Sequence, residues 1–136
     1  MKMNRFSRKI VLILIAVFAQ SSLGTNAALK DFSNVSTKNL SQNGYYKLPD
    51  GLIIQWGYSS TSGRNKTVYL PVSFYDTYYT VVISMKRKED STTNLTSDVW
   101  NQSKSSFIMY GLFHATDINN GAYTGGFNWI AIGRWK

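Results

Sequence analysis

The 136-residue sequence predicts an all-β fold, a small antiparallel sandwich-like domain of about five to seven strands. Apolar and polar residues alternate with a period of two in several runs after residue 44, and no helical periodicity follows residue 28. Turn-forming Gly, Pro, Asn and Asp separate these runs. The hydrophobic content of 43% is enough for a core, and the absence of Cys excludes disulfides and thiolate metal sites.

The residues before this domain divide into two parts. Residues 1–27 are typical of a secretory signal peptide, with a basic start and an apolar run at residues 10–19. That run is short for a bilayer span, so a weak membrane anchor or a gene fusion is the alternative. Residues 28–43 are rich in Ser, Asn and Lys and predict an extended linker. The β domain then occupies residues 44–136.

The domain opens with a turn and a strand. Pro49 fixes its own φ and Asp50-Gly51 is a turn signal, so the chain reverses before a strand at residues 52–56. One face of this strand carries three large apolar side chains, and we expect it to point into the core. These residues are Leu52, Ile54 and Trp56.

The middle of the domain predicts one hairpin and one long loop. After a polar loop at residues 59–66, the alternation at residues 68–74 predicts a strand whose Pro71 favours an edge or a bulge. We expect residues 79–85 to be its hairpin partner. Residues 86–104 are charged and rich in Ser, Thr and Asn, which predicts a loop.

Two further strands complete the domain, at residues 107–114 and 127–135, with a loop between them at residues 115–126. The last strand has apolar residues on both faces, which predicts a central position in a sheet or a face against another subunit. Four aromatic residues are expected in the core: Trp56, Phe74, Phe127 and Trp129.

Three separated motifs carry a resemblance to a known family. The first reads G-Y-x-K-L-P-x-G-L-I-I-Q-W-G at residues 44–57, and the second joins L-P-V-S-F at residues 70–74 to Y-T-V-V at residues 79–82. The third reads F-N-W-I-A-I-G at residues 127–133. In this order they resemble the C-terminal domain of bacteriophage and prophage tail fibre proteins.

The resemblance implies a non-enzymatic receptor-binding tip that forms a homotrimer, with residues 28–43 as the end of a fibre shaft. Its partner would be a bacterial surface polysaccharide, a lipopolysaccharide or an outer-membrane protein, and its location the tail fibre of a virion. If the leader exports the protein, the location is instead secreted or cell-surface, and a monomeric lectin-like adhesin is the alternative.

The composition of the predicted surface, rich in Tyr, Trp, Asn and Ser, is typical of a recognition module. We predict that loops at residues 59–66, 76–79, 86–100 and 114–124 determine specificity. The candidate receptor-binding residues are Tyr58, Arg64, Tyr75, Asp76, Tyr78, Lys86, Arg87, Trp100, His114, Asn119, Asn120 and Tyr123.

The sequence offers little catalytic or metal-binding chemistry. His114 is the only imidazole, with Asp117 nearby, but no G-x-S-x-G elbow accompanies them, so we predict no enzyme. Glu89 and Asp90 are adjacent and would point to opposite faces of a strand. We expect no cofactor, since the His-x-His iron pattern of fibres is absent, and a site made by three copies of His114 is the alternative. A polysaccharide depolymerase is the enzymatic alternative, but it usually needs a much longer repetitive domain that carries an acidic cleft, and this sequence shows no such domain.

The charge pattern argues against nucleic acid as a partner. The chain carries a formal charge of +8, but four of its 15 basic residues lie in the leader. The remaining 11 basic residues face seven acidic ones, which leaves +4. This mild excess favours approach to anionic glycans and is weaker than the basic stripe of a duplex binder.

Overall fold

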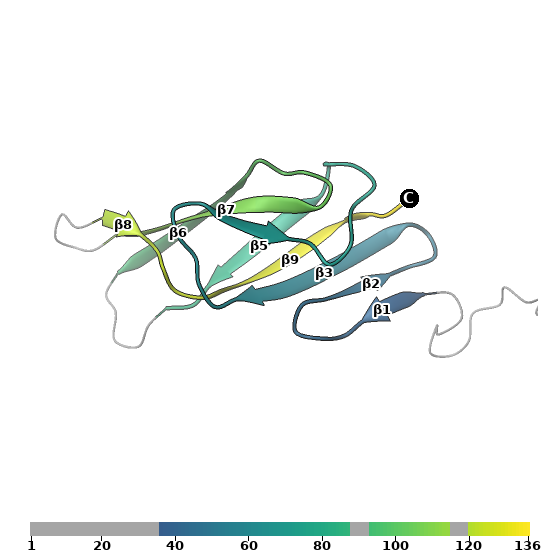
Figure 1. Cartoon of the computed structure of the whole chain (residues 1–136), viewed down its shortest axis with the longest axis horizontal. Helices are drawn as coiled ribbons and strands as arrows, with labels where there is room; N and C mark the ends of the chain where they lie inside the picture. Colours follow the sequence, from purple (N-terminus) through teal and green to yellow (C-terminus); the bar gives the residue numbers. More distant parts are fainter. Residues whose placement is uncertain (1–35, 88–92, 115–119) are drawn as a thin grey trace, which may run out of the picture. The chain divides into compact units, whose positions relative to one another are not determined.

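The computed structural model describes residues 36–87, 93–114 and 120–136, and the predicted leader lies outside them. Within these ranges the chain forms nine β-strands and no helix, which confirms the all-β fold with more strands than we predicted (Figure 1). The strands are β1 (Thr37–Asn39), β2 (Gly44–Lys47), β3 (Leu52–Ser59), β4 (Lys66–Tyr69), β5 (Thr80–Met85), β6 (Asn94–Trp100), β7 (Ser106–His114), β8 (Asn120–Ala122) and β9 (Phe127–Arg134).

Two antiparallel sheets pack against each other. One has the order β1-β2-β3-β9-β5, and the other has the order β4-β7-β6, with β8 also paired to β7. Strand β9 lies between β3 and β5, so of the two positions that its apolar faces predicted, the central one is confirmed. Across the sheets, the ring of Phe107 meets Trp129 edge-on at 5.7 Å. The buried core comprises Ile53, Val68, Phe74, Tyr79, Phe107, Met109, Phe127, Trp129 and Ala131.

Strand β3 points into the core with the face opposite to the one we predicted. Ile53 and Gln55 are fully buried, whereas Leu52 is 37% exposed and Trp56 is only half-buried. The indole N–H of Trp56 instead donates a hydrogen bond to the carbonyl of Ser41, at 3.0 Å. The expectation that Trp56 belongs to the core was therefore wrong. The other three aromatic residues expected in the core are buried: Phe74, Phe127 and Trp129.

Two hydrogen bonds of Gln55 make its burial on this face possible. Its Nε2 donates to the carbonyl of Val72, and the N–H of Val72 donates to its Oε1, both at 2.8 Å. A buried amide is tolerated when its donor and its acceptor are both satisfied. Because the satisfying partner lies 17 residues away, the alternation within β3 alone predicted the wrong face.

Strands β4 and β5 do not form the hairpin we predicted. Strand β4 ends at Tyr69 and pairs with β7, whereas β5 pairs with β9 in the other sheet. Residues 70–79 carry the chain from one sheet to the other, and Pro71 lies in this crossover instead of in a strand. The backbone N–H and C=O of Val72 hydrogen-bond with the side chain of Gln55, so these two groups need no hydrogen bonds to a neighbouring strand.

Two strands lie in stretches that we predicted to be loops. Strand β6 occupies part of residues 86–104, and β8 occupies part of residues 115–126. In β6 only Leu95 and Val99 are half-buried, as is Thr93 just before the strand, and the other side chains are exposed. Strand β6 lies at the edge of its sheet. An edge strand of this kind has the polar composition of a loop.

The sheet begins before the boundary that we predicted at residue 44. Strand β1 pairs with β2 of the same chain, with Lys38 opposite Tyr46, and residues 36–136 form one compact unit. The last part of the predicted linker at residues 28–43 is therefore ordered by its own chain from Thr37 onward.

Candidate recognition surface

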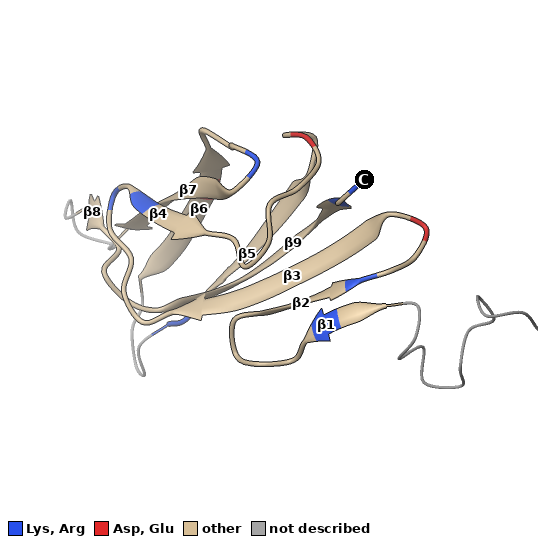
Figure 2. Cartoon of the chain, turned by 45° about the vertical axis from the view of Figure 1, so that its right-hand side comes forward, with Lys and Arg blue, Asp and Glu red and all other residues tan. Residues whose placement is uncertain are grey.

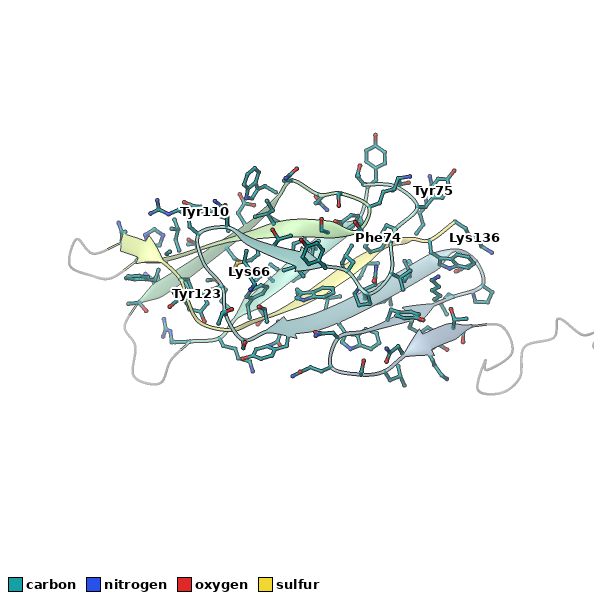
Figure 3. The ribbon with its side chains drawn as sticks, in the orientation of Figure 1. Lys66, Phe74, Tyr75, Tyr110, Tyr123 and Lys136 are labelled. Carbon is teal, nitrogen blue, oxygen red and sulfur yellow. The ribbon has the colours of Figure 1, made fainter. Side chains whose placement is uncertain are left out.

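Most of the candidate residues lie in loops or near strand ends. Figure 3 shows Tyr75 and Lys136 at one end of the described domain and Tyr123 at the other. In Figure 2 the charged segments also lie mainly in loops and at strand ends. We call the first region the tyrosine end, and it comprises Tyr75, Asp76, Tyr78, Lys104, Arg134 and Lys136. The second region, the hairpin end, comprises Tyr58, Lys86, Arg87, His114, Asn120 and Tyr123.

The tyrosine end combines exposed aromatic rings with paired charges. Tyr75 is 54% exposed and Tyr78 is 91% exposed. The Nε of Arg134 donates to Oδ2 of Asp76 at 2.8 Å, and the guanidinium lies 4.6 Å from the centroid of the Tyr75 ring. The Nζ of Lys104 lies 5.9 Å from the same ring. Hydrogen bonds from Arg134 and from the backbone N–H of Tyr78 lower the pKa of Asp76, so its carboxylate is ionised at neutral pH.

The loop that carries these tyrosines is held by buried aromatic side chains. Phe74 stacks on Tyr79 with ring centroids 4.2 Å apart. The Tyr79 hydroxyl donates to the carbonyls of Ser103 and Ser106, at 2.9 and 2.8 Å, and burial raises its pKa to about 12. The N–H of Tyr75 donates to the carbonyl of Arg134 at 2.8 Å. The exposed rings thus stand on a loop whose backbone is fixed at several points.

A shallow cleft of about 440 Å³ opens beside Tyr78. The Nζ of Lys136 at its rim donates to the carbonyl of Pro49. Trp135 packs next to the cleft, with its ring 4.9 Å from the Nζ of Lys136 and 5.0 Å from the Nζ of Lys47. The lining residues are Asp50, Gly51, Leu52, Tyr78, Gly133, Arg134 and Lys136.

Tyr123, one of the candidates at the hairpin end, is buried. Tyr123 is only 6% exposed, and its hydroxyl donates to the carbonyls of Lys86 and Gly126. Burial raises the pKa of this hydroxyl. The expectation of a loop tyrosine open to a receptor was wrong for Tyr123, because its ring fills the space between two connections. The Nζ of Lys86 lies 4.4 Å from the Tyr58 ring centroid.

A second, smaller cavity of about 180 Å³ lies at the hairpin end. The guanidinium of Arg87 donates to the carbonyl of Thr93 at 2.8 Å on its wall. The lining is mostly apolar or backbone, and comprises Arg87, Thr93, Leu95, Phe113, Ala122, Tyr123, Thr124 and Gly125.

His114 has two polar neighbours and no carboxylate partner among the described residues. Its Nε2 lies 3.2 Å from Oγ1 of Thr96, and its Nδ1 lies 3.2 Å from Oδ1 of Asn120. Asp117 and Asn119 are outside the described residues. In the described ranges, no three His, Cys, Asp or Glu side chains come close enough to hold a metal ion. In the part of the chain that the structure describes, the ring of His114 thus meets a hydroxyl and an amide.

The remaining two candidates lie in or beside the connection between β3 and β4, which contacts the hairpin end through a hydrogen bond of 2.6 Å from the hydroxyl of Ser62 to the carbonyl of Tyr123. Arg64 is exposed in the connection between β3 and β4. Trp100 is 49% exposed at the end of β6, and its indole N–H donates to Oδ1 of Asn65 at 3.3 Å.

The sequence did not predict Lys104 and Arg134 as site residues. No local pattern relates them to Tyr75, whose ring they contact in three dimensions.

The outer face of the five-stranded sheet exposes apolar side chains at its centre, with polar ones around them. Val82 is 60% exposed, Ile130 is 46%, Ile132 is 43% and Leu52 is 37%. Ile130 lies opposite Val82 on one side and Trp56 on the other, so these side chains form a continuous patch. Contiguous apolar patches on a soluble domain mark interaction sites. Across the described segments, no helix is long and apolar enough to cross a membrane.

Solved structures of pyocin tail fibres share this fold. An N-truncated R2-type pyocin tail fiber matches with a TM-score of 0.60 and 19% identity over 88% of this chain and 43% of that one. A C-terminal part of the P. aeruginosa R2 pyocin fiber matches with a TM-score of 0.59 and 20% identity over 88% and 29%. An N-truncated R1-type pyocin tail fiber matches with a TM-score of 0.56 and 19% identity over 87% and 95%.

The chain thus spans less than half the length of the two R2 fibres that it matches. No curated protein sequence matches it. Residues 47–134, well over half of the chain, match the family described as tail fiber protein gp53-like, C-terminal. The resemblance seen in the three sequence motifs is confirmed, and the chain belongs to this family of tail fibre C-terminal domains.

Proposed function

We propose that this domain is the non-enzymatic receptor-binding tip of a phage or prophage tail fibre, and that it recognises a glycan or an outer-membrane protein on a bacterial surface. The tyrosine end is the observation that carries this proposal. It exposes Tyr75 and Tyr78 beside Lys104 and Arg134 on a loop held by a buried aromatic stack. Tyrosine faces pack against sugar rings or apolar side chains at little entropic cost, and the charged groups add specificity.

We further propose that the tip is a homotrimer. Single contacts of this type are weak, and three copies on one axis raise residence on a repetitive cell surface by avidity. The exposed patch of Val82, Ile130 and Ile132 supports assembly, because a second and a third copy would cover it.

A secreted monomeric lectin-like adhesin is the second candidate. The basic start and apolar run of residues 1–27 favour it, because they are typical of an export signal. Both candidates use the same recognition surface, so the state of assembly separates them.

The first test measures the solution mass of residues 28–136 by light scattering, together with binding of the labelled protein to a panel of bacterial strains. We expect a trimer that binds at least one strain. The Ile130→Asp variant should become monomeric and bind cells more weakly, since it places a charge in the apolar patch. Thr67→Asp, on the exposed face of β4 in the other sheet, is the matched control and should stay trimeric. A well-folded wild-type monomer would contradict the trimeric mechanism, and a lack of binding to every strain would contradict receptor recognition.

A further inference from the structure

We propose that the cleft at the tyrosine end binds an acidic saccharide, a sugar that carries a carboxylate or a phosphate. This inference rests on the proposed function and deepens it, because it names the class of receptor and the place where it binds. Two features of the cleft support this inference. One is an exposed aromatic ring at the rim, and the other is a pair of cations that use only some of their N–H donors in hydrogen bonds within the described domain.

The aromatic feature is Tyr78. Tyr78 is 91% exposed, and it lines the shallow, open cleft of about 440 Å³. The N–H of Tyr78 donates to Oδ1 of Asp76 at 2.9 Å, so its backbone is held while its ring remains in solvent. A ring in this position offers a flat apolar face to the C–H face of a sugar.

The first cation is Arg134, whose side chain is 58% exposed. Its Nε donates to Asp76, and its two terminal nitrogens donate to no other group among the described residues. A guanidinium carries five N–H donors in a planar fork that fits a carboxylate or a phosphate. Arg134 can therefore keep its internal ion pair and still bind an anion.

The second cation is Lys136, whose ammonium has three N–H donors and gives one to the carbonyl of Pro49. Lys47 and Lys104 do not line the cleft, and their Nζ atoms lie over the rings of Trp135 and Tyr75.

The two acidic groups of this region already have internal donors. Asp50 accepts from the N–H of Leu52, and Asp76 accepts from Arg134. The side chains of four basic and two acidic residues in and around the cleft carry a summed charge of +2, which attracts an anion. The excess is too small for a nucleic-acid site, which needs a continuous basic stripe. A charged sugar ring satisfies both the aromatic and the cationic features.

The test uses the full-length protein and pairs of polysaccharides that differ in charge. Polygalacturonic acid carries a carboxylate on each ring, and its methyl ester is the neutral form of the same backbone. Phosphomannan and neutral mannan make the second pair, and polyglutamate supplies carboxylates without rings. Biolayer interferometry at fixed ionic strength should give an affinity about tenfold or more higher for one acidic polysaccharide than for its neutral partner and for polyglutamate. The pair that responds distinguishes a carboxylate from a phosphate.

Two substitutions locate the binding. Tyr78→Ala and Lys136→Ala should each weaken the binding of the acidic polysaccharide about tenfold, with an unchanged thermal midpoint. Tyr69→Ala removes a tyrosine that is 78% exposed outside this cleft, and Lys38→Ala removes one positive charge on the edge strand β1. Both controls should bind as the wild type does.

Three results would overturn the inference: no binding of either acidic polysaccharide, equal binding of the acidic and neutral forms, or equal losses in the cleft variants and their controls. The cell-binding panel distinguishes this failure from failure of the proposed function. If Tyr78→Ala and Lys136→Ala bind cells as well as the wild type does, the inference is wrong and receptor recognition stands. If the wild type binds acidic polysaccharide through the cleft but binds no strain, the receptor function is wrong and the site stands.

Discussion

Replacing Gln55 by leucine should destabilise the domain by about 2–4 kcal/mol. Gln55 is fully buried and makes two hydrogen bonds of 2.8 Å with the backbone of Val72. The Gln55→Leu variant leaves one N–H and one C=O without these partners, at about 1–3 kcal/mol each. Because Val72 is half-buried, water reduces the loss toward the lower part of that range. A domain of this size has a total stability of about 5–15 kcal/mol, so the variant still folds with a visibly reduced margin.

Urea denaturation followed by tryptophan fluorescence measures this loss. With an m value of about 1.5 kcal/mol per molar urea, a loss of 3 kcal/mol lowers the midpoint by about 2 M. Gln42→Leu is the matched control, since Gln42 is exposed, and its effect should stay within about 0.5 kcal/mol. A midpoint for Gln55→Leu equal to that of the wild type would refute the conclusion that these hydrogen bonds make the burial of Gln55 possible.

A second substitution at this position separates hydrogen bonding from packing. In the Gln55→Glu variant, only the protonated acid can donate to the carbonyl of Val72 while also accepting from its N–H. An ionised carboxylate would be buried facing that carbonyl, which is unfavourable. The free energy of unfolding of Gln55→Glu should therefore fall short of the wild-type value by less at pH 4 than at pH 7. A deficit that does not change with pH would show that the hydrogen bond donated to Val72 does not determine stability here.

Three further predictions concern the loops and the packing. Because an arginine hydrogen bond lowers the pKa of Asp76 from its ordinary 3.8, its contribution to stability is present above that pH and is lost in more acidic solution. The thermal midpoints of the wild type and Asp76→Asn should thus differ at pH 7 and converge in acid; a constant difference would contradict this. Burial raises the pKa of Tyr79 from 10.0 to about 12, so the stability of the wild type should fall as the pH rises between these values. The Tyr79→Phe variant has no hydroxyl to ionise at this position, and urea denaturation should show a smaller fall in its stability over the same pH range. In the Gly57→Ala variant the new Cβ would lie 2.5 Å from the Trp129 ring, which should destabilise the domain by about 1–3 kcal/mol. A Cβ at Gly63 would have nothing within 4 Å, so the thermal midpoint of the Gly63→Ala control should stay near that of the wild type.

The tyrosine end illustrates what local sequence leaves open about a site. Tyr78 and Tyr123 both lie in polar segments and were both predicted to face a receptor, yet their exposures are 91% and 6%. Arg134 pairs with Asp76 across 58 residues of sequence. A contact of that separation depends on strand pairing between distant segments, so no spacing rule predicts it.

Local alternation and motifs determined a large part of the fold. The period of two was sufficient to locate β7 and β9, because consecutive side chains of a strand point to opposite faces whatever the partner is. The apolar residues on both faces of β9 predicted its central position, and the three motifs predicted the tail fibre family. These features depend on residues that are neighbours in the chain.

Only the tertiary structure decided which face of β3 is buried, which sheet β5 joins and which charged residues surround Tyr75. Alternation reduces the first choice to two faces, and the less apolar one is buried, with its Gln55 satisfied by hydrogen bonds to Val72. Sheet pairing follows from the core that both sheets share, which brings distant strands together. Packing and hydrogen bonding act through space, and a pattern confined to one strand therefore leaves these choices undetermined.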